Sequence, residues 1–94
     1  MDLTPQTIVS RNPEAIFAPV EGETVVLEPV ADRYVSLNAT ATRLWQMLEY
    51  PASVEDLAGL LTDTYGVERP AALADVTAFV RSLDDRGLIV LSAD

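Results

Sequence analysis

The hydrophobic pattern of this chain changes its period once, near residue 38. Before that point, short segments rich in strand-forming residues cover residues 15–20, 24–28 and 33–37, and their alternation is typical of half-buried strands. Glu21-Gly22 and residues 29–32 separate them and have turn-forming sequences. Because both connections are short, we predict an antiparallel meander whose first and third strands lie at the edges.

After residue 38 the apolar residues recur at helical spacing. Asn38 is suited to cap a first helix, which ends near Tyr50 because Pro51 disfavours helical backbone in the residue before it. Ser53 and Asp56 approximate a capping box at the start of a second helix. The predicted apolar stripes are Ala41, Leu44, Trp45 and Leu48 in the first helix, and Val54, Leu57, Ala58, Leu61 and Tyr65 in the second.

A third helix opens near Pro70 and ends at Gly87. Its predicted core face contains Leu73, Val76, Val80 and Leu83. Residues 88–91 are apolar and form either a last strand or a segment tucked into the core. Residues 1–12 are predicted to be a flexible or extended lead-in, in which Ile8 and Val9 are suited to a short strand, and residues 13–94 a single domain. The order indicates an α+β fold, with a three-stranded antiparallel sheet followed by three helices, compatible with a winged helix-turn-helix arrangement.

The composition removes most of the usual catalytic groups. The 94 residues include no histidine and no cysteine, which are the commonest general base and the usual soft metal ligands. Catalysis by carboxylates alone remains open. However, neighbours on a helix, such as Asp84 and Asp85, point about 100° apart and do not converge on one atom. We expect no enzymatic activity, no metal site and no cofactor.

The charge distribution argues against a nucleic-acid partner. The net charge is −9, and the six basic residues are all arginines scattered along the chain, whereas nucleic-acid binding needs clustered cations. No segment is apolar for long enough to span a bilayer, and the N-terminus lacks the pattern of a signal peptide. We therefore expect a cytoplasmic protein without a membrane partner.

Two features stand out as candidates for binding. The strand at residues 33–37 leaves one edge free for an added strand, although an ordinary edge blunted by Arg33 explains the same pattern. Phe79 widens the apolar stripe of the third helix and suits the wall of a groove. From the residues alone, packing of Phe79 beneath the sheet or the C-terminal segment is the favoured alternative.

Three motifs, in this order and at these spacings, resemble the PqqD-like family. They are the strand-to-helix junction RYVSLN at residues 33–38, an apolar helix with a central tryptophan at Trp45, and the ending DVTAFVRSLDDRGL at residues 75–88. The resemblance runs from about Ala15 to Ile89 and leaves residues 1–12 unmatched. Members of this family are recognition elements of pathways that make ribosomally synthesised and post-translationally modified peptides (RiPPs).

The resemblance implies a winged-helix-like fold and a non-catalytic role. A precursor's leader segment would add as a strand beside residues 33–37 and lie against the third helix. Asp75 or Asp84 would then be available to basic leader residues. The implied peptide-binding residues are Arg33, Tyr34, Val35, Ser36, Leu37, Asp75, Val76, Phe79, Val80 and Leu83.

A discrete chain of this size is similar to the separate recognition proteins of lasso-peptide pathways. The implied partners are the leader peptide and a leader peptidase or other modifying enzyme. A winged-helix regulator or another protein–protein adaptor is the alternative, but the third helix carries three aspartates beside two arginines near its end. A carrier protein fits poorly, because Ser53-Val54-Glu55 does not supply the expected Asp-Ser-Leu-like motif.

Overall fold

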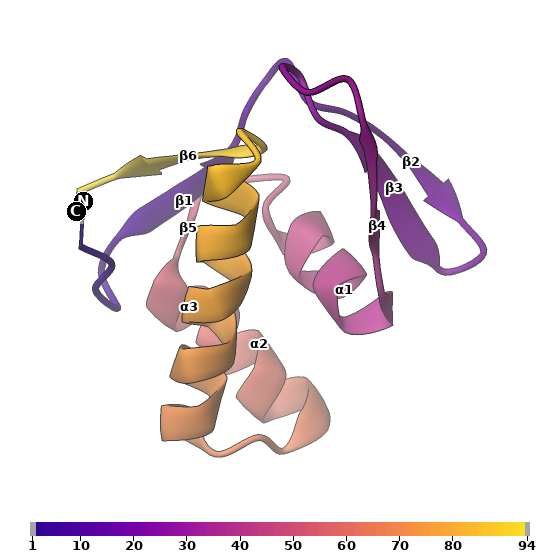
Figure 1. Ribbon diagram of the computed structural model, residues 1–94. Coiled ribbons are helices and arrows are strands. Elements are labelled where there is room, and N and C mark those ends of the chain that lie inside the picture. The colour runs from indigo at the N-terminus through magenta and orange to yellow at the C-terminus, as the bar shows by residue number, and fades with distance from the viewer. Residues whose placement is uncertain (1, 94) are drawn as a thin grey trace.

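The computed structural model describes residues 2–93, which form a small α+β fold (Figure 1). The elements in chain order are β1 (Ile8–Arg11), β2 (Ile16–Val20), β3 (Glu23–Leu27), β4 (Tyr34–Leu37), α1 (Ala39–Met47), β5 (Ala52–Ser53), α2 (Val54–Tyr65), α3 (Arg69–Asp85) and β6 (Ile89–Ser92). The predicted class, an antiparallel three-stranded sheet followed by three helices, is confirmed. No helix within residues 2–93 has the length and apolar character needed to cross a membrane.

Residues 16–37 form the predicted meander, with strand order β2-β3-β4 and antiparallel pairing. Val20 pairs with Glu23, which leaves Glu21 and Gly22 as a two-residue hairpin loop. Both loop residues have positive φ, 51° and 82°, as a type I′ turn requires. The tight loop fixes the register, and β2 and β4 lie at the edges as predicted.

The first two helices begin at the predicted caps. Asn38 Oδ1 accepts a hydrogen bond from a backbone N–H of the first turn of α1 at 2.9 Å. At α2, Ser53 Oγ accepts from the N–H of Asp56, and the Asp56 carboxylate accepts from the N–H of Ser53. This reciprocal pair is a capping box. The end of α1 differs from the prediction, because the helix stops at Met47 and not near Tyr50.

A second sheet, with strand order β5-β1-β6, was not predicted as a unit. Its central strand β1 comes from the segment predicted as a lead-in, and Val9 has no exposed surface. The β-structure therefore begins before the boundary predicted at residue 13. Of the two alternatives for residues 88–91, the strand is correct for residues 89–92, which pair antiparallel with β1.

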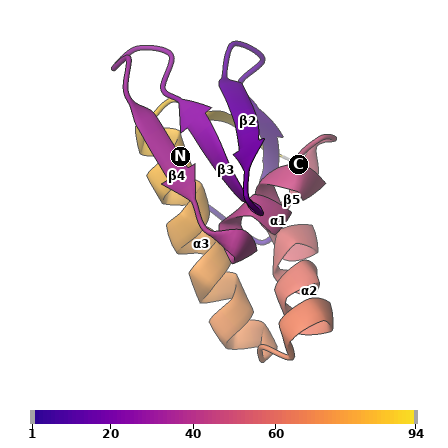
Figure 2. The same ribbon diagram turned by 90° about the vertical axis from the view of Figure 1, so that its right-hand side faces the viewer.

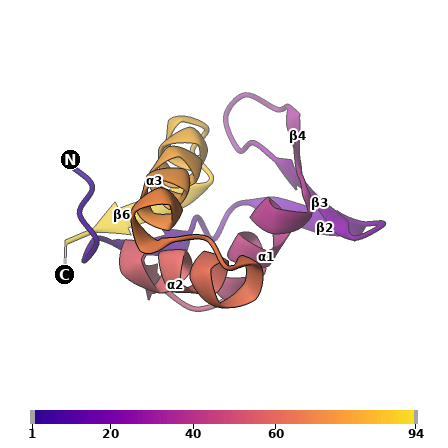
Figure 3. The ribbon, with the colours of Figure 1, turned by 90° about the horizontal axis from the view of Figure 1, so that it is seen from below.

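The helices lie between and below the two sheets (Figures 1 and 2). Seen from below, α1 lies against β2-β3-β4, while α3 crosses toward β6 (Figure 3). The predicted stripes are largely buried, with three exceptions. Tyr65 is 46% exposed, and Ala41 and Leu73 are only partly buried, whereas Ala72 is fully buried. The core comprises Val9, Val26, Leu37, Leu44, Trp45, Leu48, Ala52, Val54, Leu57, Ala58, Leu61, Ala72, Val76, Val80, Leu83, Leu88 and Ile89.

Arg11 joins the two sheets through the end of α1. Its Nε donates to the Trp45 carbonyl at 3.1 Å, and its Nη2 donates to the same oxygen. The guanidinium lies 4.6 Å from the ring centroid of Phe17 and 4.8 Å from that of Trp45. In a longer helix the N–H of Glu49 would bond that carbonyl; instead Glu49 donates to Gln46, and within residues 2–93, besides Arg11, only the N–H of Leu48 donates to the Trp45 carbonyl, at 3.1 Å. The cation thus satisfies a helix terminus where α1 stops.

We expect Arg11→Met to lower the free energy of unfolding by about 1–2 kcal/mol, because it removes a charge-assisted hydrogen bond and a cation–π contact. Urea denaturation followed by the fluorescence of Trp45 measures the effect. Arg43→Met is the matched control, because Arg43 is exposed on α1, the helix that Arg11 contacts, and its replacement should leave stability nearly unchanged. Equal effects of the two substitutions would contradict the assigned role of Arg11.

Candidate functional site

β4 presents one free edge, because β3 pairs with its other side and no second strand pairs with it within residues 2–93. Just before the strand, the N–H of Glu28 donates to the Arg33 carbonyl at 2.7 Å. Hydrogen-bonded and non-hydrogen-bonded pairs alternate along antiparallel strands. Val35 therefore directs its backbone polar groups toward β3, while Tyr34 and Ser36 direct theirs to the free edge.

The side chains of β4 alternate between the inner and the outer face of the sheet. Leu37 is buried and Val35 is partly buried against the core, while Tyr34 and Ser36 are exposed on the outer face. Register places Tyr34 in a row with Leu27 and Ile16 on that outer face. Nothing in the described part of the chain covers this row, and Tyr34 is 74% exposed. An added strand would continue both faces of the sheet.

The predicted contacts on α3 separate into two groups. Asp75 is exposed and Phe79 is half-buried, and both line a cavity. Val76, Val80 and Leu83 are no more than 2% exposed and belong to the core. These three side chains pack inward and expose almost no surface, so their contact with a peptide stays a prediction.

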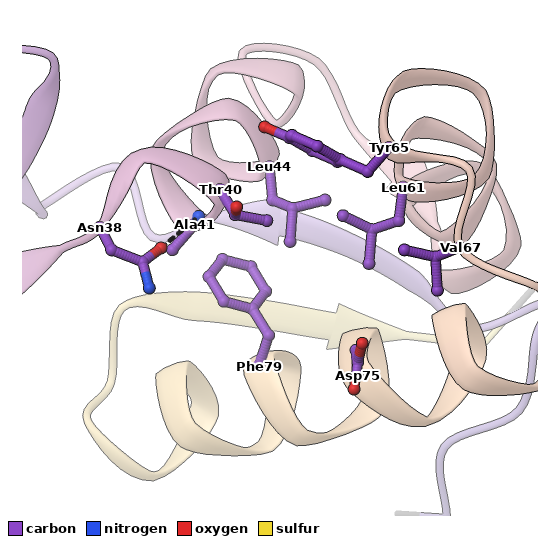
Figure 4. A pocket seen from close by; sticks show the side chains of 9 residues that line it. All are labelled: Asn38, Thr40, Ala41, Leu44, Leu61, Tyr65, Val67, Asp75 and Phe79. Carbon is purple, nitrogen blue, oxygen red and sulfur yellow. Dashed lines mark hydrogen bonds between the residues drawn. The ribbon is translucent and has the colours of Figure 1, made fainter.

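The cavity beside Phe79 has a volume of about 410 Å³ and lies where α1, α2 and α3 meet (Figure 4). The Phe79 ring points into it from α3 and faces Ala41 and Leu44 of α1, and Leu61 also lines it (Figure 4). Its full lining is Asn38, Thr40, Ala41, Leu44, Leu61, Tyr65, Val67, Asp75 and Phe79. The walls are mainly apolar, and the site suits a large apolar side chain.

A second cavity, of about 390 Å³, lies at the other end of β4. Its lining is Glu28, Val30, Ala31, Arg33, Asp84, Asp85, Arg86 and Gly87. Asn38 after β4 and Arg33 before it therefore mark two openings. The first lies among α1, α2 and α3, and the second lies between the loop before β4 and the end of α3. Both predicted acidic positions lie along this side of the molecule, Asp75 at the first opening and Asp84 at the second.

Glu28 lines the second opening and forms an ion pair with Arg86 at the end of α3. Its carboxylate is 2% exposed, lies 2.7 Å from Nη1 of Arg86 and lies 3.5 Å from Nη2 of Arg33. The hydrogen bond from Arg86 lowers the pKa of Glu28 from its ordinary value; burial acts in the opposite direction, and the positive charge of Arg33 adds to the lowering. Glu28 is therefore held ionised between the sheet and the helix.

Sequence reasoning missed the role of Glu28 although a signal was present. Thr24, Val26 and Glu28 alternate with outward residues in the segment at residues 24–28, so Glu28 occupies an inward position. A charged side chain at such a position requires a partner, because burying an unpaired charge is costly. The identity of Arg86 as that partner depends on the tertiary fold. The contribution of Tyr65 to the first cavity was missed because its spacing fits the buried stripe of α2.

The free edge of β4 and the first cavity offer groups suited to binding. Within residues 2–93 no group of three or more acidic side chains is placed to hold a metal ion. The open edge offers backbone donors and acceptors, and the first cavity offers apolar walls. Together these features fit an extended peptide.

The model of the family described as coenzyme PQQ synthesis protein D (PqqD) matches residues 23–89, which is more than half of the chain. The chain belongs to the PqqD family. The resemblance inferred from the strand-to-helix junction, the tryptophan helix and the chain's ending is thereby confirmed. A search of curated proteins finds no match.

Three solved structures are similar to this PqqD-family chain. TbiB1 in complex with the TbiA(beta) leader peptide is 27% identical with a TM-score of 0.81, over 90% of this chain and 99% of that one. A lasso peptide synthetase B1 complexed with its leader peptide is 33% identical with a TM-score of 0.74, over 87% and 96%. The PqqD truncation of Methylobacterium extorquens PqqCD, a stand-alone RiPP recognition element, matches with a TM-score of 0.78 over 95% of each chain. At 16% identity, it shows the shared fold.

We expect Glu28→Gln to lower the free energy of unfolding at neutral pH, with a deficit that disappears in acid. The folded-state pKa of Glu28 is lowered from 4.5, so its ionised carboxylate stabilises the fold above that pH and loses this effect as the pH falls through the folded pKa. Urea denaturation of both proteins between pH 7 and about pH 3 tests this. Glu23→Gln makes the same charge change at an exposed site in β3, the strand that Glu28 directly follows. A deficit that persists unchanged in acid would show that packing, and not charge, is responsible.

Proposed function

We propose that this protein is a non-catalytic recognition element, which binds the leader segment of a ribosomally made precursor peptide as a strand on the free edge of β4. The observation that carries the proposal is the combination of this open edge with the apolar cavity beside Phe79. The similarity to two leader-peptide complexes supports it.

Binding divides into a general part and a selective part. The backbone groups of Tyr34 and Ser36 would bond a peptide of almost any sequence, because they contact its main chain. Selectivity would come from the peptide side chains that face α3, because each must fit the cavity that it enters. The stretch from Arg33 to Asn38 spans roughly 16 Å at about 3.3 Å per residue, so a leader segment of similar length reaches from one opening to the other.

The functional consequence is tethering. A leader held on this protein keeps the attached core peptide at high local concentration beside an enzyme that binds the same complex. A lasso-type leader peptidase and cyclase are our first choice for that enzyme, supported by the similarity to a lasso peptide synthetase B1. We place the protein in the cytoplasm, where ribosomal synthesis delivers the precursor.

A winged-helix regulator is the alternative with a related fold, and the charge of the surface disfavours it. DNA binding needs clustered cations facing phosphates. On α3, Asp75, Asp84 and Asp85 accompany Arg69 and Arg81, and Arg86 is engaged with Glu28. Such a helix would repel a phosphate backbone.

The first test is titration of the protein with a fluorescent leader peptide from the neighbouring precursor gene, at low and high salt. We expect saturable binding that largely survives high salt, because main-chain bonds and apolar contacts are little screened. Absence of binding by the folded protein would contradict the proposed function. Binding that collapses in salt would contradict the apolar strand-addition mechanism.

We expect Phe79→Ala to raise the leader Kd about tenfold or more, because truncating a central aromatic contact costs at least about 1.4 kcal/mol. The same fluorescence titration measures the change. Ser82→Ala is the control, because Ser82 is exposed on α3 outside the cavity. A folded Phe79→Ala variant with unchanged affinity would exclude this cavity from the binding site.

Proline substitutions on β4 separate edge recognition from sheet stability. Ser36→Pro removes a donor from the free edge, so we expect weaker leader binding from a protein that still folds. Val35→Pro instead removes a bond to β3, so we expect its main effect to be lower stability in urea. Normal leader binding by a folded Ser36→Pro variant would contradict the proposed pairing edge.

A further inference from the structure

The sheet β2-β3-β4 is held to α3 by a single polar link in the described part of the chain. The Glu28 carboxylate bonds Arg86, the residue that ends α3. Within residues 2–93, no other side-chain hydrogen bond or ion pair joins residues 16–37 to residues 69–86. The second contact of this carboxylate is with Arg33, which lies just before β4.

The two ends of β4 are restrained differently. At one end, the strand continues through Asn38 directly into α1, and Thr42 Oγ1 donates to the Leu37 carbonyl at 3.2 Å. At the other end, a loop connects β4 to β3, with a positive φ of 54° at Asp32 and an almost fully exposed Val30. The covalent structure therefore fixes β4 relative to α1 near Asn38, while the Arg33 end of β4 is attached only through the loop.

We propose that Glu28 acts as a positioning residue, whose bridge from Arg33 to Arg86 sets the separation between β4 and α3 and thereby the fit of the bound strand. The effect on the fit of the bound strand rests on the proposed function, whereas the effect on the separation between β4 and α3 does not. A strand must meet the β4 edge and the α3 surface at the same time, so a wider separation loses one set of contacts.

The chemistry of the bridge explains why a carboxylate is needed. One oxygen accepts a hydrogen bond from Arg86 and the other forms an ion pair with Arg33, and a neutral amide cannot reproduce both contacts with equal strength. The charged groups around the bridge are Arg33 from the β4 side, and Asp84, Asp85 and Arg86 from the end of α3. Arg33 is the weaker partner, because its side chain is 73% exposed and lies 3.5 Å away.

The separation is measurable without any ligand. The chain contains no cysteine, so a Tyr34→Cys/Ser82→Cys variant accepts two spin labels at defined exposed positions on β4 and α3. Electron–electron double resonance then gives their distance distribution. We expect Glu28→Gln in this background to shift the distribution to longer distances and to broaden it, while Glu23→Gln leaves it unchanged.

Arg86→Gln keeps the test decisive if Glu28→Gln does not fold. It removes the same bond from the helix side, so it should widen the distribution to a similar extent. Combining the two substitutions should add little, because both break one bridge. Arg33→Gln should have a smaller effect. An unchanged distribution in folded Glu28→Gln and Arg86→Gln variants would overturn the proposed positioning role.

Leader titration of proteins without the cysteine substitutions tests the effect of this separation on the fit of the bound strand. We expect Glu28→Gln and Arg86→Gln to raise the Kd at least fivefold under conditions where both are folded, while Glu23→Gln keeps the original Kd. A widened distribution with unchanged affinity would overturn the link between separation and binding. If the unmodified protein also fails to bind leader, the proposed function fails, whereas the distance measurement still decides the role of Glu28.

Discussion

The direct passage from β4 into α1 at Asn38 is the constraint on which the rest of this structure depends. The Asn38 side chain caps the helix while the strand before it is still paired with β3. No flexible connection separates the two elements, so the free edge and the mouth of the apolar cavity have fixed relative positions. Trp45, on the same helix, then anchors this unit in the core.

Two arginine contacts complete the assembly in different ways. Arg11 binds a backbone carbonyl and two aromatic rings, so its partners remain in place at any pH at which the protein is folded. Arg86 binds a carboxylate, which can take up a proton. The first contact fixes one sheet to the other through α1, while the second holds a sheet to α3 under conditions that depend on ionisation.

Local signals explain why most elements were predictable. The capping residues Asn38 and Ser53, the Glu21-Gly22 loop and the helical periodicity all act within a few residues of the elements they define. The sheet built on β1 was not predictable in the same way. Ile8 pairs with Ser53 and Ser92. The sequence around each of these residues does not indicate which distant segment it pairs with.

The candidate site shows the same division between local and distant information. The free edge followed from the order of three short strands, whereas the inward orientation of Val76, Val80 and Leu83 depends on how α3 rotates against α2 and β6. Periodicity identified the apolar face of α3 but did not distinguish core from groove. Phe79 and Asp75 lie on the flank of that face, where the helix meets the cavity.

The uncovered outer face of β2-β3-β4 has a consequence for colloidal behaviour. Ile16, Leu27 and Tyr34 form an apolar row on a sheet that also has two open edges, an arrangement that favours association between copies. The net charge of −9 opposes such association through long-range repulsion. Acid removes this repulsion by neutralising carboxylates, and it also neutralises Glu28. Because the pKa of Glu28 is lowered, the repulsion between molecules is lost at a higher pH than the link that Glu28 forms within one molecule.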